Sequence, residues 1–295
     1  MRRLAVVACA ALACARTDLG ATQQRIDAGI DARLPSTDFK VWYPDAHVAF
    51  TTHVWHSRDA SIDDFPFDRV GAFTHDGYYM GVTRGAKAFM LDSSGDVAWS
   101  QSVQGLDVYD AQPRSDGKRL LVTSEAYGAP PTPSIGTLDS DGTYHPLATN
   151  IVDRPAYGSD GTTIVFVELL HDGTYELETM HDDGSQRTVW MTTATPVQLP
   201  SFSWDQQRIV FATPASIVVL DCASSATTTL IESDAATMYG FPSFTPDGSA
   251  IIYVEEAYEG AEDSIVRLDI ATRARTTLLE GGTSEFSAGI SIAED

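Results

Sequence analysis

Five short stretches of the chain carry apolar residues four and six positions after an aspartate. Successive side chains of a strand point to opposite faces, so this period of two predicts strands with one buried face. The alternating pairs are Met80 and Val82, Leu120 and Val122, Ile164 and Phe166, Ile209 and Phe211, and Ile251 and Tyr253. The β-branched and aromatic residues among them strengthen the prediction.

These stretches are copies of one repeat. Each copy begins with an anchor aspartate, usually followed by glycine, and this pair predicts a tight turn before the strand. The anchors are Asp76, Asp116, Asp160, Asp205 and Asp247, at spacings of 40, 44, 45 and 42 residues. Gln206 replaces glycine in the fourth copy, so we expect a different turn type there. A weaker sixth copy contains Asp45, 31 residues before Asp76.

Two more apolar segments follow each repeat strand. The nearer segments are 88–92, 135–139, 177–181, 217–221 and 265–269, and the farther ones are 97–99, 144–147, 188–190, 227–231 and 276–279. Together with the strand before the anchor, each unit of about 43 residues then holds four strands. A unit this small cannot bury its own faces, so neighbouring units must pack on each other.

Four antiparallel strands repeated radially predict an all-β fold, a β-propeller of four-stranded antiparallel blades. The length of residues 39–295 predicts six blades, with five or seven as alternatives. Residues 289–293 alternate like a strand, and we expect them to complete the first blade beside residues 39–52. The N- and C-terminal strands would then close the ring and remove exposed sheet edges.

The repeats resemble the WD40-like repeats of the TolB β-propeller family, whose pattern runs roughly P-x-F-S-P-D-G-x-x-I-x-F. The stretches that carry the resemblance are SFTPDGSAIIYV (243–254), SFSWDQQRIVFA (201–212) and the turn HDDGSQRTVW (181–190). The resemblance implies a location in the cell envelope and a binding scaffold. TolB itself has an additional N-terminal α/β domain, for which residues 16–38 are too short, so the resemblance does not extend to TolB as a whole.

The N-terminus resembles an export signal. Residues 1–15 combine Arg2 and Arg3 with a short apolar segment, too short to span a bilayer. The stretch ending at Cys14 resembles a bacterial lipobox, which predicts lipidation of Cys14 and a lipid-anchored envelope protein. Cleavage at an A-x-A site, giving a periplasmic or secreted protein, is the alternative. Residues 16–38 are polar and predict a tether.

Charge and cysteine content narrow the range of partners. The 295 residues contain 19 Lys and Arg against 41 Asp and Glu, a formal net charge of −22, so we expect no nucleic-acid partner. Of the three cysteines, Cys9 and Cys14 belong to the signal region. Cys222 lies in an apolar run, which predicts a buried structural side chain.

The chemistry-bearing motifs are weak, and we expect no catalytic residues, metal or cofactor. His53, His56 and His75 are candidate zinc ligands, but two histidines three apart on a strand point to opposite faces. We therefore interpret them as surface or loop histidines. The sequence Asp139-Ser-Asp-Gly142 resembles the opening of a calcium loop without its later ligands, and we interpret it as a hairpin turn.

One positional set forms a candidate ligand-binding face. Eight residues after each clear anchor, at the end of the repeat strand, the chain carries a polar residue. The members are Arg84, Ser124, Glu168, Thr213 and Glu255, with His53 or Thr52 in the weak first copy. Blade symmetry predicts that they meet near the central channel. Glu125 and Glu256 add negative charge there, which favours a cationic ligand.

These observations predict a non-catalytic lipoprotein whose propeller binds an envelope protein or a small ligand. The alternative is a propeller hydrolase or lyase that acts on oligosaccharides in the central channel.

Overall fold

The computed structural model describes residues 38–44, 52–58, 60, 62–65, 70–74, 79–84, 86–92, 96–126, 132–233, 237–257, 263–280 and 291–294. All regular structure in these residues is β-strand. Within the same residues there is no helix long and apolar enough to cross a membrane. Residues 1–37, which contain the predicted signal, Cys14 and most of the tether, lie outside the description. The predicted all-β class is confirmed.

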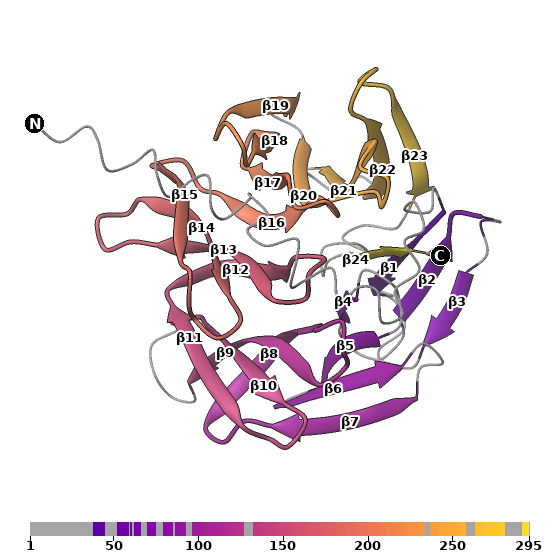
Figure 1. Cartoon of the computed structure of the whole chain (residues 1–295). Helices are drawn as coiled ribbons and strands as arrows, with labels where there is room; N and C mark the ends of the chain where they lie inside the picture. The colour runs from indigo at the N-terminus through magenta and orange to yellow at the C-terminus, as the bar shows by residue number, and fades with distance from the viewer. Residues whose placement is uncertain are drawn as a thin grey trace, which may run out of the picture.

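The described strands form six antiparallel sheets of four strands, here numbered in chain order. Sheet 1 has the order β24-β1-β2-β3, and the others follow the chain: β4–β7, β8–β11, β12–β15, β16–β19 and β20–β23 for sheets 2 to 6. Figure 1 shows the sheets arranged around a common centre, with β4, β8, β12, β16, β20 and β24 nearest to it. The predicted four-stranded antiparallel organisation is confirmed.

Sheets 1 to 3 contain β1 to β11 together with β24. Their bounds are β1 Phe39–Pro44, β2 Thr52–His56, β3 Ile62–Phe65, β4 Val70–Phe73, β5 Tyr79–Arg84, β6 Lys87–Asp92, β7 Val97–Ser102, β8 Leu106–Pro113, β9 Arg119–Ala126, β10 Ser134–Asp139 and β11 Tyr144–Thr149, with β24 at Ser291–Glu294.

Sheets 4 to 6 follow the same plan. Their bounds are β12 Ile151–Tyr157, β13 Thr163–Leu169, β14 Tyr175–His181, β15 Thr188–Thr193, β16 Gln198–Phe202, β17 Arg208–Thr213, β18 Ser216–Asp221, β19 Thr227–Glu232, β20 Thr237–Phe244, β21 Ala250–Ala257, β22 Ser264–Asp269 and β23 Arg275–Glu280.

The anchor aspartates build the turn between the first and second strands of their sheets. The Oδ1 atoms of Asp116, Asp160 and Asp247 each accept a hydrogen bond, at 2.8 to 3.0 Å, from the backbone N–H two residues on. The residue after each of these three anchors is a glycine with a positive φ, a conformation that favours glycine. Local Asx geometry therefore explains why the Asp-Gly pair marks the repeat.

The expectation of a different turn at Gln206 is wrong. Gln206 has φ 54°, close to the 66° to 68° of Gly117, Gly161 and Gly248. Its N–H donates to the Ser203 carbonyl at 2.8 Å, as the N–H of Gly248 donates to Thr245. The surrounding turn imposes the conformation, and Gln206 adopts it without glycine's steric freedom.

Sheet 1 also departs from the expected register of the repeat. Its innermost strand is β24, which pairs antiparallel with β1, so β1 is the second strand of the sheet. The anchor of every other copy precedes the second strand, whereas Asp45 follows it. The sixth copy is therefore not equivalent to the others, because the first strand of sheet 1 comes from the other end of the chain.

The core lies between the sheets. Five clusters of buried apolar side chains join sheets 2 and 3, 3 and 4, 4 and 5, 5 and 6, and 6 and 1. Phe166, for example, is fully buried on sheet 4 in a cluster with Leu121 and Ile135 of sheet 3. Cys222 is fully buried between sheets 4 and 5, as its apolar context predicts. Each sheet is stabilised mainly by burial against its neighbours.

Candidate functional site

The residues of the candidate ligand-binding face lie at one end of their sheets. Arg84, Ser124, Glu168, Thr213 and Glu255 are on the second strands β5, β9, β13, β17 and β21, at or near their C-terminal ends. His53 is on the third strand of sheet 1, where it pairs with Tyr43 at the end of β1. The structure thus brings His53 to the corresponding end of its sheet, one strand farther from the centre.

Four of these side chains bind partners within their own sheets. Ser124 Oγ is 3.2 Å from Ser134 Oγ, and Thr213 Oγ1 is 2.8 Å from Ser216 Oγ. The other two side chains form ion pairs with an arginine at or just before the start of the fourth strand. Glu168 pairs with Arg187, and Glu255 pairs with Arg275. Except for His53, the set therefore lies one strand out from the centre, and these four members are engaged in bonds within their sheets.

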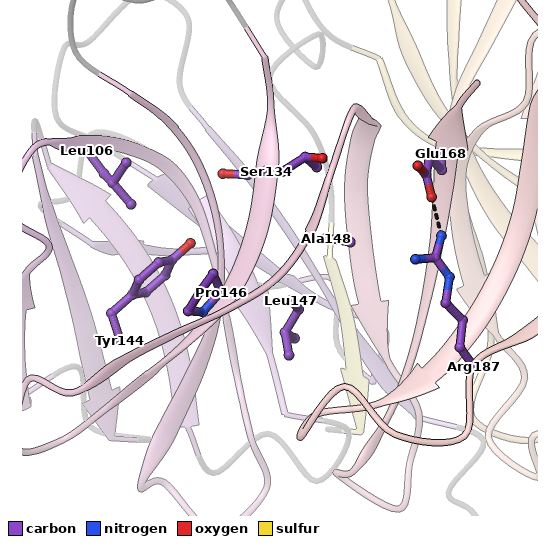
Figure 2. A pocket seen from close by; sticks show the side chains of 9 residues that line it. Leu106, Ser134, Tyr144, Pro146, Leu147, Ala148, Glu168 and Arg187 are labelled. Carbon is purple, nitrogen blue, oxygen red and sulfur yellow. Dashed lines mark hydrogen bonds and ion pairs between the residues drawn. The ribbon is translucent and has the colours of Figure 1, made fainter. Parts of the chain in front are cut away.

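One member of the set, Glu168, lines a pocket formed by residues of sheets 3 and 4, and a second, Ser124, is buried behind its wall. The pocket has a volume of about 440 Å³, and Glu168 is part of its wall (Figure 2). Ser134 and Tyr144, which also line it, contact Ser124. Sequence symmetry places Ser124 and Glu168 at equivalent positions of successive sheets, and in the structure only Glu168 faces the pocket, while Ser124 lies behind Ser134 and Tyr144.

A second polar group lies at the centre, on the innermost strands. Asp110 of β8 is 1% exposed, and its Oδ1 lies 3.6 Å from Nε of Arg154 on β12. The Arg154 guanidinium carbon is 5.4 Å from the ring centroid of Phe241 on β20. These three strands belong to sheets 3, 4 and 6, so Arg154 connects sheets that are not all neighbours. A cation–π contact of this kind contributes about 0.5–2 kcal/mol.

Irregular backbone accompanies this central group. The pairing register shifts between Val152 and Ala156 in β12 and between Gly240 and Ser243 in β20. Asp153 and Phe241 lie within these interruptions, with φ of 59° and 51°. A left-handed conformation costs a non-glycine residue roughly 1–2 kcal/mol, and such strain is common at functional sites.

Titratable groups at the centre have shifted pKa values. Burial raises the pKa of Asp110, although Arg154 opposes the shift, and burial likewise raises the pKa of Asp153. Burial, followed by the charges of Glu125, Asp110 and Asp153, raises the pKa of Tyr109. Perturbed groups gathered on the inner strands mark the centre as a candidate binding site.

Sequence reasoning missed the central residues because it followed the alternating second strand. Charged residues within these strand segments were the signal that could have revealed the central group. Asp110 lies in LDVYDAQP, and Asp153 and Arg154 lie in IVDRPAY. Charged residues in the innermost strand of a packed sheet need a partner or a function.

The described residues hold no group of three or more His, Cys, Asp and Glu side chains arranged for a metal ion. His53 and His56 both lie on β2, and His75 is outside the described residues. The hairpin interpretation of residues 139–142 is confirmed: Gly142 donates to the Asp139 carbonyl at 2.9 Å, and Thr143 to Asp141 Oδ1 at 2.9 Å.

Solved structures share this fold. TolB from Acinetobacter baumannii has a TM-score of 0.66 and 17% identity, covering 87% of this chain and 66% of its own. A putative TolB from Agrobacterium tumefaciens has a TM-score of 0.61 and 14% identity, covering 85% and 92%. An oligogalacturonate lyase in complex with manganese has a TM-score of 0.55 and 14% identity, covering 81% and 73%. No family model and no curated protein matches the sequence.

The fold is therefore that of the TolB-like β-propeller proteins. Identities of 17% and below establish the architecture and leave the activity open, since one fold supports many functions. This chain covers 66% of the first of these TolB chains, so about a third of that TolB chain lies outside the match.

Proposed function

We propose that this chain is a non-catalytic β-propeller of the cell envelope that binds a protein or small ligand at the centre of its ring. The observation that carries the proposal is the central group of Asp110, Arg154 and Phe241. A cation whose side chain is 24% exposed is held there between a buried carboxyl and an aromatic ring. Fixed polar and aromatic groups of this kind are typical of binding sites.

In this proposal the six sheets are six blades, and β24 closes the ring. The innermost strands support it, since β4, β8, β12, β16 and β20 each contact the next, and β24 contacts both β20 and β4. A closed ring holds the inner strands rigidly, so Arg154 would be positioned before the ligand arrives.

The envelope location completes the proposal. Residues 1–15 would direct export, and a lipid on Cys14 would anchor the propeller to a membrane through the tether of residues 16–38. Mass spectrometry of the mature N-terminus should find a lipid-modified Cys14. An unmodified N-terminus after Ala13 or Ala15 would instead support a periplasmic or secreted protein.

Capture from an envelope fraction tests the binding function. The full chain should retain a partner or ligand that Arg154→Gln loses by at least about tenfold, since truncating an anchor residue has effects of this size. Lys118→Gln is the matched control, because it removes one positive charge from an exposed turn. Equal capture by Arg154→Gln and the parent, with both variants folded, would contradict the central site.

The alternative function, a lyase or hydrolase of oligosaccharides, is supported by the likeness to oligogalacturonate lyase. Incubation of the full chain with oligogalacturonate, with and without manganese, tests it directly. Turnover above a no-protein blank would favour the enzyme over the binding scaffold.

A further inference from the structure

The pocket between sheets 3 and 4 has one apolar wall and one polar wall. Leu106, Pro146, Leu147 and Ala148 line the apolar side, and Tyr144 stands beside them (Figure 2). Arg187 and Glu168 of sheet 4 form the opposite side. A volume of about 440 Å³ is in the range of small-molecule sites.

Arg187 is fixed in place before any ligand binds. Its Nε and Nη2 donate to the carboxylate of Glu178, which is fully buried, at 2.5 and 2.7 Å, and Nη2 also donates to Glu168. The guanidinium carbon lies 5.4 Å from the ring centroid of Phe166. Figure 2 shows the remaining terminal nitrogen, Nη1, directed toward the side of the pocket where Ala148 lies. An immobilised donor binds a ligand without a further loss of side-chain entropy.

Tyr144 is fixed at the end of the pocket away from Arg187, where it also packs against the apolar cluster between sheets 2 and 3. A Cβ atom at Gly136 would stand 2.5 Å from atoms of the Tyr144 ring and hydroxyl, so only glycine lets this side chain lie against the sheet. The Tyr144 hydroxyl is 3.5 Å from Ser124 Oγ, which is 3.2 Å from Ser134 Oγ. The pocket therefore has an aromatic surface with hydroxyl groups at its edge.

The local charge is unfavourable for an anion. Arg187 supplies one positive charge against the carboxylates of Glu168 and Glu178. The whole chain adds a net charge of −22. The pocket thus offers both hydrogen-bond donors and acceptors, and its net charge is not positive.

We propose that this pocket binds a neutral saccharide. The C–H face of a sugar ring would pack on Tyr144 and the apolar wall. Sugar hydroxyls, which both donate and accept, would take the Nη1 donor of Arg187 and the Glu168 and Ser134 acceptors. The lining residues come from β8, β10, β11 and sheet 4 and do not include Arg154, so the proposed sugar site does not depend on the central site.

Titration of the full chain with neutral sugars tests the proposal. The probes are glucose, maltose, cellobiose and N,N′-diacetylchitobiose, with galacturonic acid as the anionic comparison, followed by saturation-transfer NMR and calorimetry. At least one neutral sugar should bind, with a dissociation constant on the order of 1 mM or below. Galacturonic acid should bind at least about tenfold more weakly than that sugar.

A blocking variant ties the binding to this pocket. Thr149 is an exposed lining residue, and Thr149→Trp should weaken sugar binding at least about tenfold by filling the pocket. Thr229→Trp makes the same change at an exposed position of the outer strand β19 and should leave binding unchanged. The proposal is overturned if no neutral sugar binds, if the acidic sugar binds best, or if Thr149→Trp retains parental affinity. Arg154→Gln should not change the result, which separates this test from that of the proposed function.

Discussion

Gln206 has a left-handed backbone conformation, which is strained for a residue that has a side chain. Its φ of 54° is the one that glycine adopts in the equivalent turns. Replacing it with glycine removes a cost of roughly 1–2 kcal/mol, partly offset by the greater freedom of glycine in the unfolded chain. The replacement also removes the 3.1 Å hydrogen bond from Gln206 Nε2 to Ser159 Oγ, an exposed contact.

We therefore expect Gln206→Gly to raise the free energy of unfolding by about 0.5–1 kcal/mol in urea titrations. Gln207→Gly, one residue on, has no positive φ to relieve and should destabilise the protein. If Gln206→Gly proves neutral or destabilising, the strain at this turn is not a significant energetic term.

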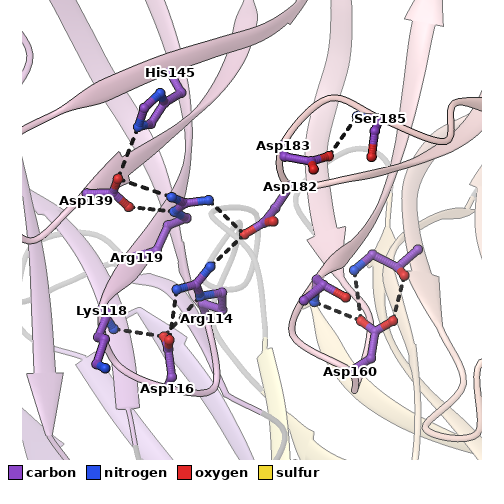
Figure 3. Close-up of polar contacts among 12 residues, drawn as sticks. Arg114, Asp116, Lys118, Arg119, Asp139, His145, Asp160, Asp182, Asp183 and Ser185 are labelled. Carbon is purple, nitrogen blue, oxygen red and sulfur yellow. Dashed lines mark hydrogen bonds and ion pairs between the residues drawn. The ribbon is translucent and has the colours of Figure 1, made fainter. Parts of the chain in front are cut away.

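At the scale of elements, charged groups connect the turns of sheets 3 and 4 (Figure 3). Asp182 is 7% exposed and accepts from Arg114 Nη1 at 3.0 Å and Arg119 Nη1 at 3.2 Å. Both arginines also bind aspartates of their own sheet, Asp116 and Asp139. One carboxylate thus joins two sheets through two charge-assisted contacts.

Asp182→Asn should lower the free energy of unfolding by about 2–3 kcal/mol, because a nearly buried partner of two guanidinium groups loses its charge. Asp183→Asn is the control, since the Asp183 carboxylate is exposed and bonds the N–H of Ser185 in its own turn. Equal urea midpoints for the two variants would mean that the contact between the sheets contributes little.

Lowering the pH should weaken the ion pairs that Arg114 and Arg119 form with their aspartates. Arg119, and then His145, hold the pKa of Asp139 below its ordinary value, and Arg114 and the Lys118 N–H lower that of Asp116 despite burial. A depressed folded pKa gives stability that is present above the unfolded value, near 3.9, and lost as pH falls through the folded one. The melting temperature should therefore drop between about pH 5 and pH 2, and it should drop less in Asp139→Asn. A slope unchanged by that substitution would exclude Asp139 as a source of the pH dependence.

At the scale of the whole molecule, the structural features shared by all repeats could be predicted from the sequence. The features specific to a single sheet could not. The second strands were predictable because Ile164 and Phe166 alternate with a period of two and pack on the neighbouring sheet. The expectation of a single buried face is wrong, because Val165 and Val167 on the opposite face are fully buried against sheet 5. A strand before each anchor was also predicted, but the charged and strained residues of these innermost strands were not, because their bulges break that period: Asp153 and Phe241 stand where the register shifts. The ion pair between Glu168 and Arg187 could not be predicted from the repeat pattern either, because the two residues are two strands apart and are joined by the long Arg187 side chain.

Sheet 1 combines β1 to β3 with β24, which is far from them in the sequence. Deleting β24 therefore tests whether this strand holds the six sheets together. β24 pairs with β1 from Phe39↔Glu294 to Trp42↔Ser291, and it contacts β4 and β20 of the adjacent sheets. Removing residues 291–295 would leave the inner edge of β1 unpaired and separate sheets 6 and 2. A loss of a few kcal/mol in a chain of this size lowers the melting temperature by on the order of 10 °C. We expect that decrease in calorimetry, with a broader transition, while removal of Asp295 alone, beyond the last residue of β24, should change nothing. An unchanged, cooperative transition after deletion of the strand would show that β24 does not close the ring.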